Sequence, residues 1–570
     1  MMMFIPTPSC GSLCLTTFIV LLTGSVSQVT SRIDKFKAAV YEHAVVLPDT
    51  KVVVSRAEAL AAMEMNLVTY WEQTAKAKEQ GASIIVFPED GLYGFSFTRD
   101  TVQPFLEDIP DPKAVTWSPC LDPERYPDTE VQRQLSCMAR NNSIYLVADI
   151  GDKKPCNVTE DQKCPQDGRY QYNTAVAFDP DGYLVARYHK FKLFFEYQFD
   201  TPEPEPIYFD TPFGRFGLFV CFDVLFLEPA VTMVTQHNVT NIVFPTAWMD
   251  ALPLLSAIGF HSSFARGLGV NFLSSNLHLP DRRFHGSGIY SPEGVKEFYY
   301  NSSHTSPGKL LVAELNVLLT RNPQGGVDVS ELSSAASLDS QKTGGETANG
   351  SNAVVEDSGS SNSEEFQSLL FDDSFTFKAL EEDSANVSVC QNKVCCHLSY
   401  SKENLGGASP DDLFALGAFD GLHTKEGQYY LQICALVKCS DAGDRKSCGN
   451  VTSVSDTIFH QLDLHGDFQT PFVYPQLILN SASSRDNLAL APQDSWSSQH
   501  GAMFLRPGLR DPVLSAALFG RAYDRDDGQA KCAGAKCGGV KGPGDSANPN
   551  VKGGYLTTFL TLTVLLFTLF

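Results

Sequence analysis

Residues 83–89 read SIIVFPE, an apolar run that ends in a proline and is followed at once by a carboxylate. The β-branched residues predict a short strand buried on both faces. Pro88 stops this strand, so Glu89 is expected at its carboxyl end. An earlier apolar run, FKAAVYEH at 36–43, predicts a second strand.

A helix is predicted between these two strands. Ser55 and Glu58 have the spacing of a capping box, apolar residues follow at helical intervals, and Gly81 closes the segment. Strands and helices continue to alternate to about residue 321, with a hairpin turning at 179–182. This order predicts an α/β fold of sandwiched layers. The later segments are VQRQLSCMAR, SIYLVADI, TAVAF, YLVARYH, GRFGLFV, VTMVTQH, NIVFP, the region 254–267 and VNFLSSN.

The composition changes after residue 322. Residues 325–365 hold ten serines and eight acidic residues but only one base, Lys342, which predicts a disordered insertion over 323–365. From 366 to 525, alternating strands such as QYYLQICALVKC predominate between Gly, Pro and Asp clusters. We therefore expect a first domain over 28–322, a second, mainly β domain stapled by disulfides, and a polar tail at 526–547.

Both ends of the chain indicate export. Residues 1–27 hold the apolar core LCLTTFIVLL before small residues, as in a secretory signal peptide, but carry no basic residue. Residues 548–570 place a polar spacer before an apolar tail, which is typical of a removed GPI-anchor signal with Asp545 or Ser546 as the attachment residue. A tail-anchored helix is the alternative. The pattern predicts a protein anchored on the extracellular face of the plasma membrane, with a form released from the membrane as the alternative.

Seven Asn-x-Ser/Thr sequons predict glycosylated, exposed loops in a secreted chain. The net charge of −23, from 66 acidic and 43 basic residues, argues against a nucleic-acid partner. No Gly-rich phosphate loop and no Cys/His zinc spacing stands out, so we expect no cofactor and no metal. The sequons begin at Asn141, Asn157, Asn238, Asn301, Asn349, Asn386 and Asn450.

The cysteine count leaves one thiol over. Of 15 cysteines, Cys10 and Cys14 fall in the signal peptide, and the remaining 13 cannot all pair. Parity alone lets any of them be free, but the surroundings of Cys221, at the end of GRFGLFV, favour it. The local candidates for bridges are Cys120 with Cys137 and Cys156 with Cys164, and six more cysteines crowd one C-terminal region, namely Cys390, Cys395, Cys396, Cys434, Cys439 and Cys448.

Glu89, Lys190 and Cys221 each follow an apolar strand, where open α/β sheets collect functional groups. Each has an ordinary alternative: a solvated carboxylate, a surface lysine and a small core residue. Together they form a chemical set, because a thiol that attacks an amide needs a base, a cation and a backbone N–H for the developing oxyanion. Glu89 is the predicted base, Lys190 the cation, and Phe222 the N–H donor.

The residues also carry a resemblance. FPED at Glu89, RYHK at Lys190 and VCFD at Cys221 resemble, in that order, the triad of the nitrilase superfamily of carbon–nitrogen hydrolases. The resemblance implies an α-β-β-α sandwich and an accessory glutamate about 25 residues before the nucleophile, which falls on Glu196. A surface carboxylate on a loop is the alternative for Glu196. Trp248 in PTAWM is predicted beside the acyl group, with a place in the core as its alternative.

Longer stretches resemble the vanin and biotinidase group within that superfamily. They include IIVFPEDGLYGF, CPQDGRYQYNTAVAFD and LFALGAFDGLHT. The resemblance implies an amidohydrolase acting on a small-molecule amide, either pantetheine, as in vanins, or biocytin and biotin amides, as in biotinidase. The anchor signal favours the vanin type, whereas FKLFFEYQFD resembles biotinidase. A catalytically silent surface protein of the same fold is the remaining alternative.

Overall fold

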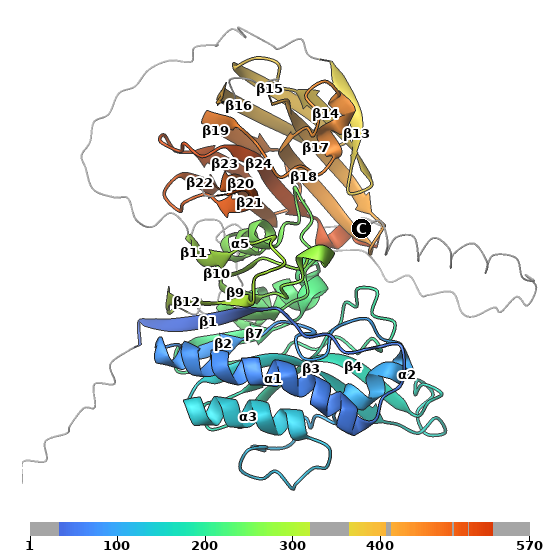
Figure 1. The fold of residues 1–570 in the computed structure, drawn as a ribbon. Helices are drawn as coiled ribbons and strands as arrows, with labels where there is room; N and C mark the ends of the chain where they lie inside the picture. The colour runs from blue at the N-terminus through green and yellow to red at the C-terminus, as the bar shows by residue number, and fades with distance from the viewer. Residues whose placement is uncertain (1–32, 320–363, 406–411, 482–483, 500, 528–570) are drawn as a thin grey trace, which may run out of the picture.

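The computed structural model describes residues 33–319, 364–405, 412–481, 484–499 and 501–527. Figure 1 shows an α/β domain, coloured blue to green, beneath a β domain coloured yellow to red. Six of the sequence predictions lie wholly or almost wholly outside the described residues. They are the signal peptide, the anchor signal, the lipidation positions Asp545 and Ser546, the sequon at Asn349, nearly all of the acidic insertion and nearly all of the polar tail at 526–547.

Two six-stranded mixed sheets build the N-terminal domain. The first has the strand order β12-β1-β2-β3-β4-β5, with β1, β2 and β3 parallel, and the second has β11-β10-β9-β8-β7-β6, with β7, β8 and β9 parallel. The strands are β1 (Lys35–His43), β2 (Ile84–Val86), β3 (Tyr145–Pro155), β4 (Arg169–Phe178), β5 (Leu184–His189), β6 (Tyr208–Thr211), β7 (Gly214–Leu218), β8 (Asn241–Pro245), β9 (Asn271–Ser275), β10 (Ser287–Ser291), β11 (Gly294–Tyr299) and β12 (Gly308–Asn316).

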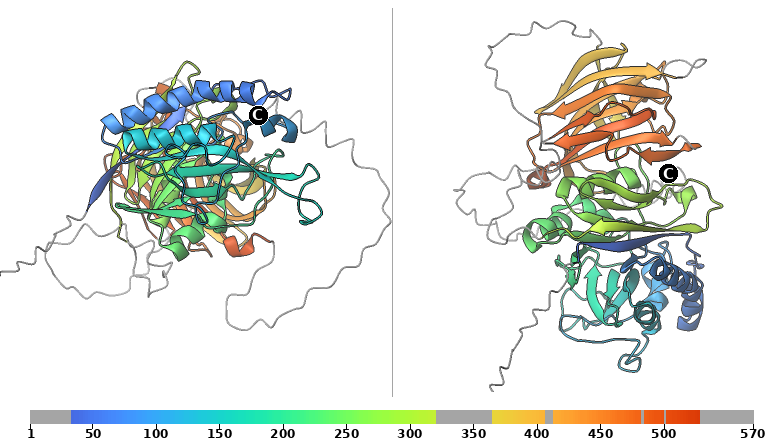
Figure 2. Two further views of the ribbon diagram at one scale, coloured as in Figure 1. Left: turned by 90° about the horizontal axis from the view of Figure 1, so that it is seen from below. Right: turned by 90° about the vertical axis from the view of Figure 1, so that its left-hand side faces the viewer.

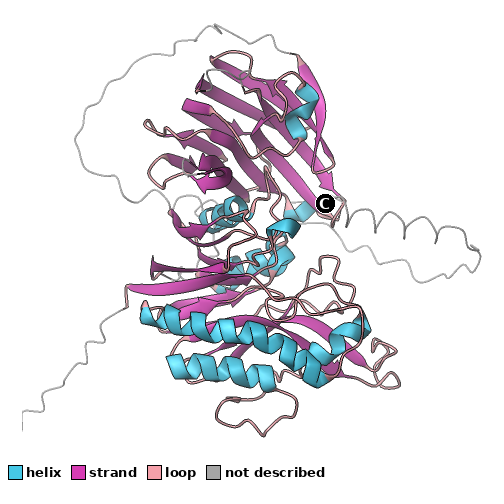
Figure 3. Cartoon of the chain, in the orientation of Figure 1, coloured by secondary structure: helices cyan, strands magenta, loops and turns pink. Residues whose placement is uncertain are grey.

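Alternate residues of the first sheet face two different cores. On β1, Ala38 and Val40 pack in the cluster that joins the two sheets, whereas Ala39 and Tyr41 pack against the helices outside. This period of two is the geometry of a strand buried on both faces, and it explains why these strands read as continuous apolar runs. The layers follow the predicted α-β-β-α order, as the ribbon in Figure 2 and the cartoon in Figure 3 show.

Five α-helices flank the sheets in the described part of this domain. Ser55 and Glu58 make the predicted capping box at the first, in which the Ser55 backbone N–H donates to Glu58 Oε2 over 2.8 Å. Gly81 follows that helix with φ +85°, a conformation that costs glycine little. No described helix is both long and apolar enough to cross a membrane. The helices are α1 (Arg56–Glu79), α2 (Arg99–Val102), α3 (Glu130–Asn142), α4 (Thr232–His237) and α5 (Ala257–Leu268).

The C-terminal domain is mainly β, as predicted, and forms a sandwich of two antiparallel sheets around its own apolar core. One sheet has the order β13-β14-β17-β18-β24-β20-β21 and the other β15-β16-β19-β23-β22. Its strands are β13 (Glu365–Leu370), β14 (Asp373–Ala379), β15 (Ser384–Gln391), β16 (Val394–Asn404), β17 (Phe414–His423), β18 (Tyr429–Lys438), β19 (Thr457–Gly466), β20 (Val473–Ser481), β21 (Ser484–Leu490), β22 (Trp496–Gln499), β23 (Ala502–Leu505) and β24 (Val513–Arg521).

Five disulfides form within the described residues, and Cys221 is the one free cysteine there. The two local bridges predicted from the sequence are confirmed. Cys532 and Cys537 lie outside the described residues. The bridges are Cys120–Cys137, Cys156–Cys164, Cys390–Cys395, Cys396–Cys434 and Cys439–Cys448.

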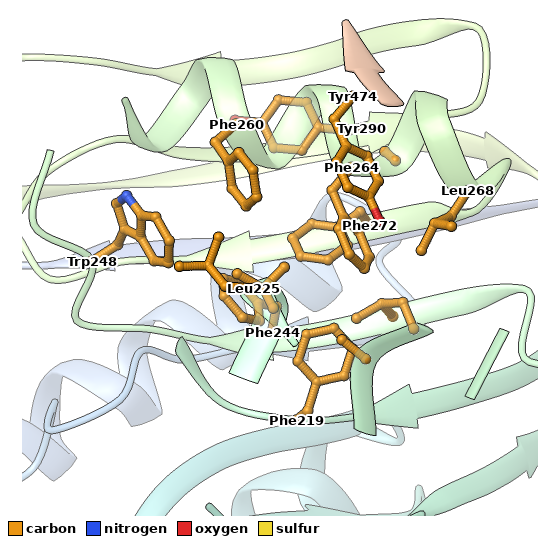
Figure 4. Packing of buried hydrophobic residues seen from close by; sticks show 14 of the residues in the cluster. Phe219, Leu225, Phe244, Trp248, Phe260, Phe264, Leu268, Phe272, Tyr290 and Tyr474 are labelled. Carbon is orange, nitrogen blue, oxygen red and sulfur yellow. The ribbon is translucent and has the colours of Figure 1, made fainter. Parts of the chain in front are cut away.

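Helix α5 is shared by the two domains. Figure 4 shows its aromatic residues between the second sheet and the β domain. Phe260 lies edge-on to Phe519 with ring centroids 5.4 Å apart, and Phe264 stacks on Tyr474 at 5.6 Å. Aromatic pairs at these distances stabilise beyond the area they bury. The two domains therefore share a continuous apolar core.

Arg521 makes the polar contact between the domains. Its side chain is fully buried at the end of β24, and its Nε donates to the carbonyl of Leu225, beside Cys221, over 2.9 Å. The other guanidinium nitrogens bond to Tyr430 O and to Asp526. A buried guanidinium is tolerated when its donors are satisfied, as they are here.

We predict that Arg521→Leu destabilises the protein by roughly 3 kcal/mol or more, because it leaves the Leu225 carbonyl without its donor and removes the charged partner of Asp526. Thermal unfolding of the purified variant measures this loss. Arg510→Leu is the matched control, since Arg510 is exposed in the same domain. Equal melting temperatures for the two variants would contradict the prediction.

Candidate active site

The structure brings Glu89 and Lys190 into direct contact and places Cys221 within reach of their charges. Glu89 follows β2, Lys190 follows β5 and Cys221 follows β7, and all three are buried. Lys190 Nζ donates to Glu89 Oε1 over 2.6 Å, and the charges of both residues act on the Cys221 thiol. The predicted base, cation and nucleophile therefore form one cluster, although they belong to two different sheets.

Glu196 belongs to the same cluster. It accepts a hydrogen bond from Lys190 Nζ, and its Oε2 also accepts the Phe194 backbone N–H over 3.0 Å. Its side chain is only 9% exposed, so the alternative of a surface carboxylate does not describe it. The position supports the accessory role that the resemblance implied.

Asn173, on β4, is a site residue that the sequence reasoning missed. Its Nδ2 donates to Glu89 Oε1 over 2.8 Å and to Glu196 Oε1 over 2.6 Å. A signal was present, because Asn173 is the polar first residue of the apolar run NTAVAF. A polar side chain pointing into a buried strand layer usually has specific hydrogen-bond partners.

The electrostatics set the resting protonation states. Burial acts to lower the pKa of Lys190, but the charges of Glu196, Glu89 and Cys221 outweigh it and raise that pKa well above its ordinary value. Burial and the charge of Glu89 raise the pKa of the Cys221 thiol well above its ordinary value, against the opposing effect of Lys190. The lysine is therefore an ammonium and the cysteine a neutral thiol, which needs a base before it can attack.

Two further buried carboxyls, Asp90 and Asp149, lie beside this cluster. Burial, and then the charge of Glu89, raises the pKa of each well above its ordinary value. Asp149 Oδ1 accepts the Asp90 backbone N–H over 3.2 Å. Burial therefore favours the neutral form of both carboxyls beside Lys190 and the two glutamates.

The predicted nucleophile, Cys221, lies on a strained turn. Cys221 has φ +47°, in the left-handed region that non-glycine residues rarely occupy, and begins a 3₁₀ turn over Cys221–Leu225. Asp223 fixes this turn by accepting the N–H groups of Val220 at 3.1 Å and Lys192 at 2.8 Å. Phe222 is the second residue of the turn, where an N–H has no acceptor inside the helix, in keeping with its predicted oxyanion role.

The side chain of Trp248 packs in the core, and the backbone of the residue before it contacts the site. The indole Nε1–H donates to Leu255 O over 2.8 Å, and the ring stacks on Phe260 at 5.7 Å, as Figure 4 shows. The structure thus favours the core alternative for this side chain. The preceding residue, Ala247, donates its N–H to Glu89 Oε2 over 2.7 Å, a contact that the sequence did not reveal.

The loop over residues 191–200 directly follows Lys190. Phe195 and Tyr197 flank the accessory Glu196 and are 49% and 76% exposed. Lys192 ties the start of the loop to Asp223. An exposed aromatic pair beside a buried polar cluster is suited to contact the non-reacting part of a small ligand.

The sequons have different exposures. Asn141, Asn157, Asn386 and Asn450 are exposed, which suits a glycan. Asn238 and Asn301 are half-buried. Asn238 ends α4 with φ +55°, and Asn301 Nδ2 donates to the Tyr299 hydroxyl over 2.8 Å.

Comparison with known proteins gives two family matches. Residues 37–257 match the carbon-nitrogen hydrolase family, and residues 364–526 match the vanin C-terminal domain. The pantetheinase of Mus musculus is 50% identical over 499 residues, which is 87% of this chain and 90% of the relative. The pantetheinase of Homo sapiens is 46% identical, covering 90% and 93% of the two chains. The biotinidase of Mus musculus is 42% identical, covering 88% and 95%.

These matches cover both described domains and confirm the resemblance drawn from the motifs. The carbon-nitrogen hydrolase match contains Glu89, Lys190 and Cys221. The second match spans the β sandwich that holds Arg521. The chain belongs to the carbon-nitrogen hydrolase family and, within it, to the group of pantetheinases and biotinidases that carry a vanin C-terminal domain.

Proposed function

We propose that this chain hydrolyses the amide of pantetheine to pantothenate and cysteamine through a thioester on Cys221. The buried contact between Lys190 and Glu89 beside a free thiol is the observation that carries the chemistry. The substrate follows from similarity, because the relatives at 46–50% identity are named pantetheinases and those named biotinidase are at 42%.

In the first half-reaction, the Cys221 sulfur attacks the amide carbon while Glu89 accepts the thiol proton. Lys190 Nζ and the Phe222 N–H stabilise the oxyanion. The carbon–nitrogen bond then breaks, Glu89 returns the proton to the leaving nitrogen, and cysteamine departs. A pantothenoyl thioester remains on the sulfur.

In the second half-reaction, water attacks the thioester carbon and Glu89 accepts its proton. The carbon–sulfur bond breaks, the proton returns to the sulfur, and pantothenate leaves with the hydroxyl oxygen from water. Glu89 thus acts as base and acid in turn, and Lys190 stabilises both oxyanions.

The hydrogen bonds assign the proton transfer to one oxygen of Glu89. Oε1 already accepts from Lys190 Nζ and Asn173 Nδ2 and has no lone pair left. Among the described residues, Oε2 accepts only the Ala247 N–H, which leaves one lone pair. This remaining position is the one that takes the thiol proton.

The proposal extends to the setting of the enzyme. We place it outside the cell on a GPI anchor attached at Asp545 or Ser546, with glycans on the exposed sequons. The five disulfides support an oxidising compartment, because such bridges persist there. A lone buried thiol among them is consistent with a catalytic role.

We expect Cys221→Ala to abolish hydrolysis and Lys190→Ala to lower kcat by about 10²- to 10³-fold, as for loss of an oxyanion donor.

Glu89→Gln fails earlier, because an amide cannot accept the thiol proton, so no thioester forms. Cysteamine release and the intact mass of quenched protein measure the two steps. Glu203→Gln, at a side chain 85% exposed, is the control. Peptide mapping without reduction that finds Cys221 in a disulfide would refute the mechanism.

For the substrate, we predict a higher kcat/KM for pantetheine than for biocytin. A pocket that hydrogen-bonds the pantoyl hydroxyls discriminates against a ligand without them by up to roughly 10⁴-fold. The segment FKLFFEYQFD, which contains Phe195 and Tyr197, resembles biotinidase, so we expect slow biocytin cleavage to remain. Competition assays give the ratio. Faster cleavage of biocytin would reverse the assignment, and a chimera with a typical vanin loop at 191–200 should then restore pantetheine preference.

The anchor proposal predicts that phosphatidylinositol-specific phospholipase C releases the protein from intact cells. Truncation after Ala547 should give a secreted, fully active form, because the described domains end before it. Surface immunostaining before and after the enzyme, with assay of the supernatant, measures both. Protein retained on the membrane after treatment would favour the tail-anchored helix instead.

A further inference from the structure

Four side chains at the site form a closed ring of hydrogen bonds. Lys190 Nζ donates to Glu89 Oε1 and to Glu196 Oε2, and Asn173 Nδ2 donates to Glu89 Oε1 and to Glu196 Oε1. The two carboxylates are thus bridged twice, once by an ammonium and once by a neutral amide. All four side chains are nearly inaccessible to water.

Asn173 is held in place from its main chain as well. Its carbonyl oxygen accepts the Lys190 backbone N–H over 2.9 Å, which joins β4 to the residue after β5. Its Oδ1 is buried and has no hydrogen-bond partner among the described residues, so the amide is oriented by the two glutamates alone. One nitrogen with two hydrogens matches two acceptors, a property that serine and aspartate lack.

The ring has a consequence for Glu89. Without the Asn173 amide, Oε1 would regain a lone pair, and either oxygen could take the thiol proton. With it, Oε2 alone remains open, already aligned by the Ala247 N–H. Holding the reacting lone pair in one direction is the kind of preorganisation that raises turnover without changing substrate affinity.

We propose that Asn173 is a positioning residue that directs Oε2 of Glu89 at the nucleophile and keeps the two glutamates from competing for Lys190. This inference rests on the proposed hydrolase activity for its kinetic readout. The bridging geometry also predicts how the thiol behaves without any substrate.

The groups that face Asn173 define the expected pH behaviour. Glu89 and Glu196 accept from its amide, and the Lys190 backbone N–H donates to its carbonyl. Asp90, Asp149 and Cys221 interact electrostatically with those three residues. A carboxylate at position 173 would add negative charge beside Glu89, in the cluster whose charges act on Cys221. It should therefore raise the pKa of both groups and move the rising limb of the pH profile to higher pH.

Asn271 offers a closely matched control. Its Nδ2 also donates to two acceptors, Asn241 Oδ1 at 2.8 Å and Asn316 O at 3.0 Å, and it is fully buried with an unpartnered Oδ1. It lies at the start of β9, at the opposite end of its strand from the catalytic edge. Asn173→Ser and Asn271→Ser therefore each remove two buried Nδ2–H hydrogen bonds, to carboxylates at position 173 and to neutral oxygens at position 271.

The experiment compares Asn173→Ser, Asn173→Asp and Asn271→Ser in the full-length enzyme. We expect both Asn173 variants to lose about 10- to 100-fold in kcat with KM changed less than about threefold. Asn271→Ser should lower the melting temperature by a similar amount while keeping kcat. Equal kinetic losses in the Asn173 and Asn271 variants, or a KM effect alone, would overturn the proposal.

A second readout is the rate at which iodoacetamide alkylates Cys221, followed by mass spectrometry across pH. Asn173→Asp should shift this profile to higher pH, whereas Asn271→Ser should leave it unchanged. This shift can be measured without substrate. If the wild type cleaved no pantetheine but Asn173→Asp still shifted the alkylation profile, the substrate assignment would be refuted and the positioning role would stand. An unshifted profile in Asn173→Asp would refute the positioning role itself.

Discussion

A lysine ammonium placed out of reach of water is the constraint on which the site depends. Lys190 is 2% exposed, and a buried cation is costly unless charged partners surround it. Glu89 and Glu196 supply them, so the end of β2, the end of β5 and the following loop must meet at one point. Any arrangement of the sheets that separated these segments would leave the ammonium unpaired. The cluster proposed to be catalytic is thus also a constraint on the fold.

Much of the N-terminal domain could be predicted because its signals are local. SIIVFPE has the composition of a buried strand and ends in a proline, and Ser55 and Glu58 have the spacing of a capping box. The strand and the start of the helix could therefore be predicted without knowledge of distant contacts. Glu89, Lys190 and Cys221 were recognisable because each directly follows an apolar run. Their chemical types also fit one reaction.

The contacts that could not be predicted cross between segments. Asn173, on β4, reaches Glu89 across β3, the strand that lies between β4 and β2 in the sheet. The backbone N–H of Ala247 reaches Glu89 from the opposite sheet. Backbone donors leave no mark on a sequence. Trp248 illustrates the converse, because a large aromatic after a strand fits a cleft and a core equally well until its neighbour Phe260 is known.

The five bridges in the described part of the chain all close loops within one domain, over sequence separations of 5 to 38 residues. None of them links the N-terminal domain to the β sandwich. The two domains are held together by the shared apolar face of α5 and by Arg521. A reductant would therefore loosen hairpins and loops but leave the two halves joined. The proposed product, cysteamine, is itself a thiol that can reduce disulfides. Because the interface between the domains contains none of these five bridges, such reduction would not separate the domains.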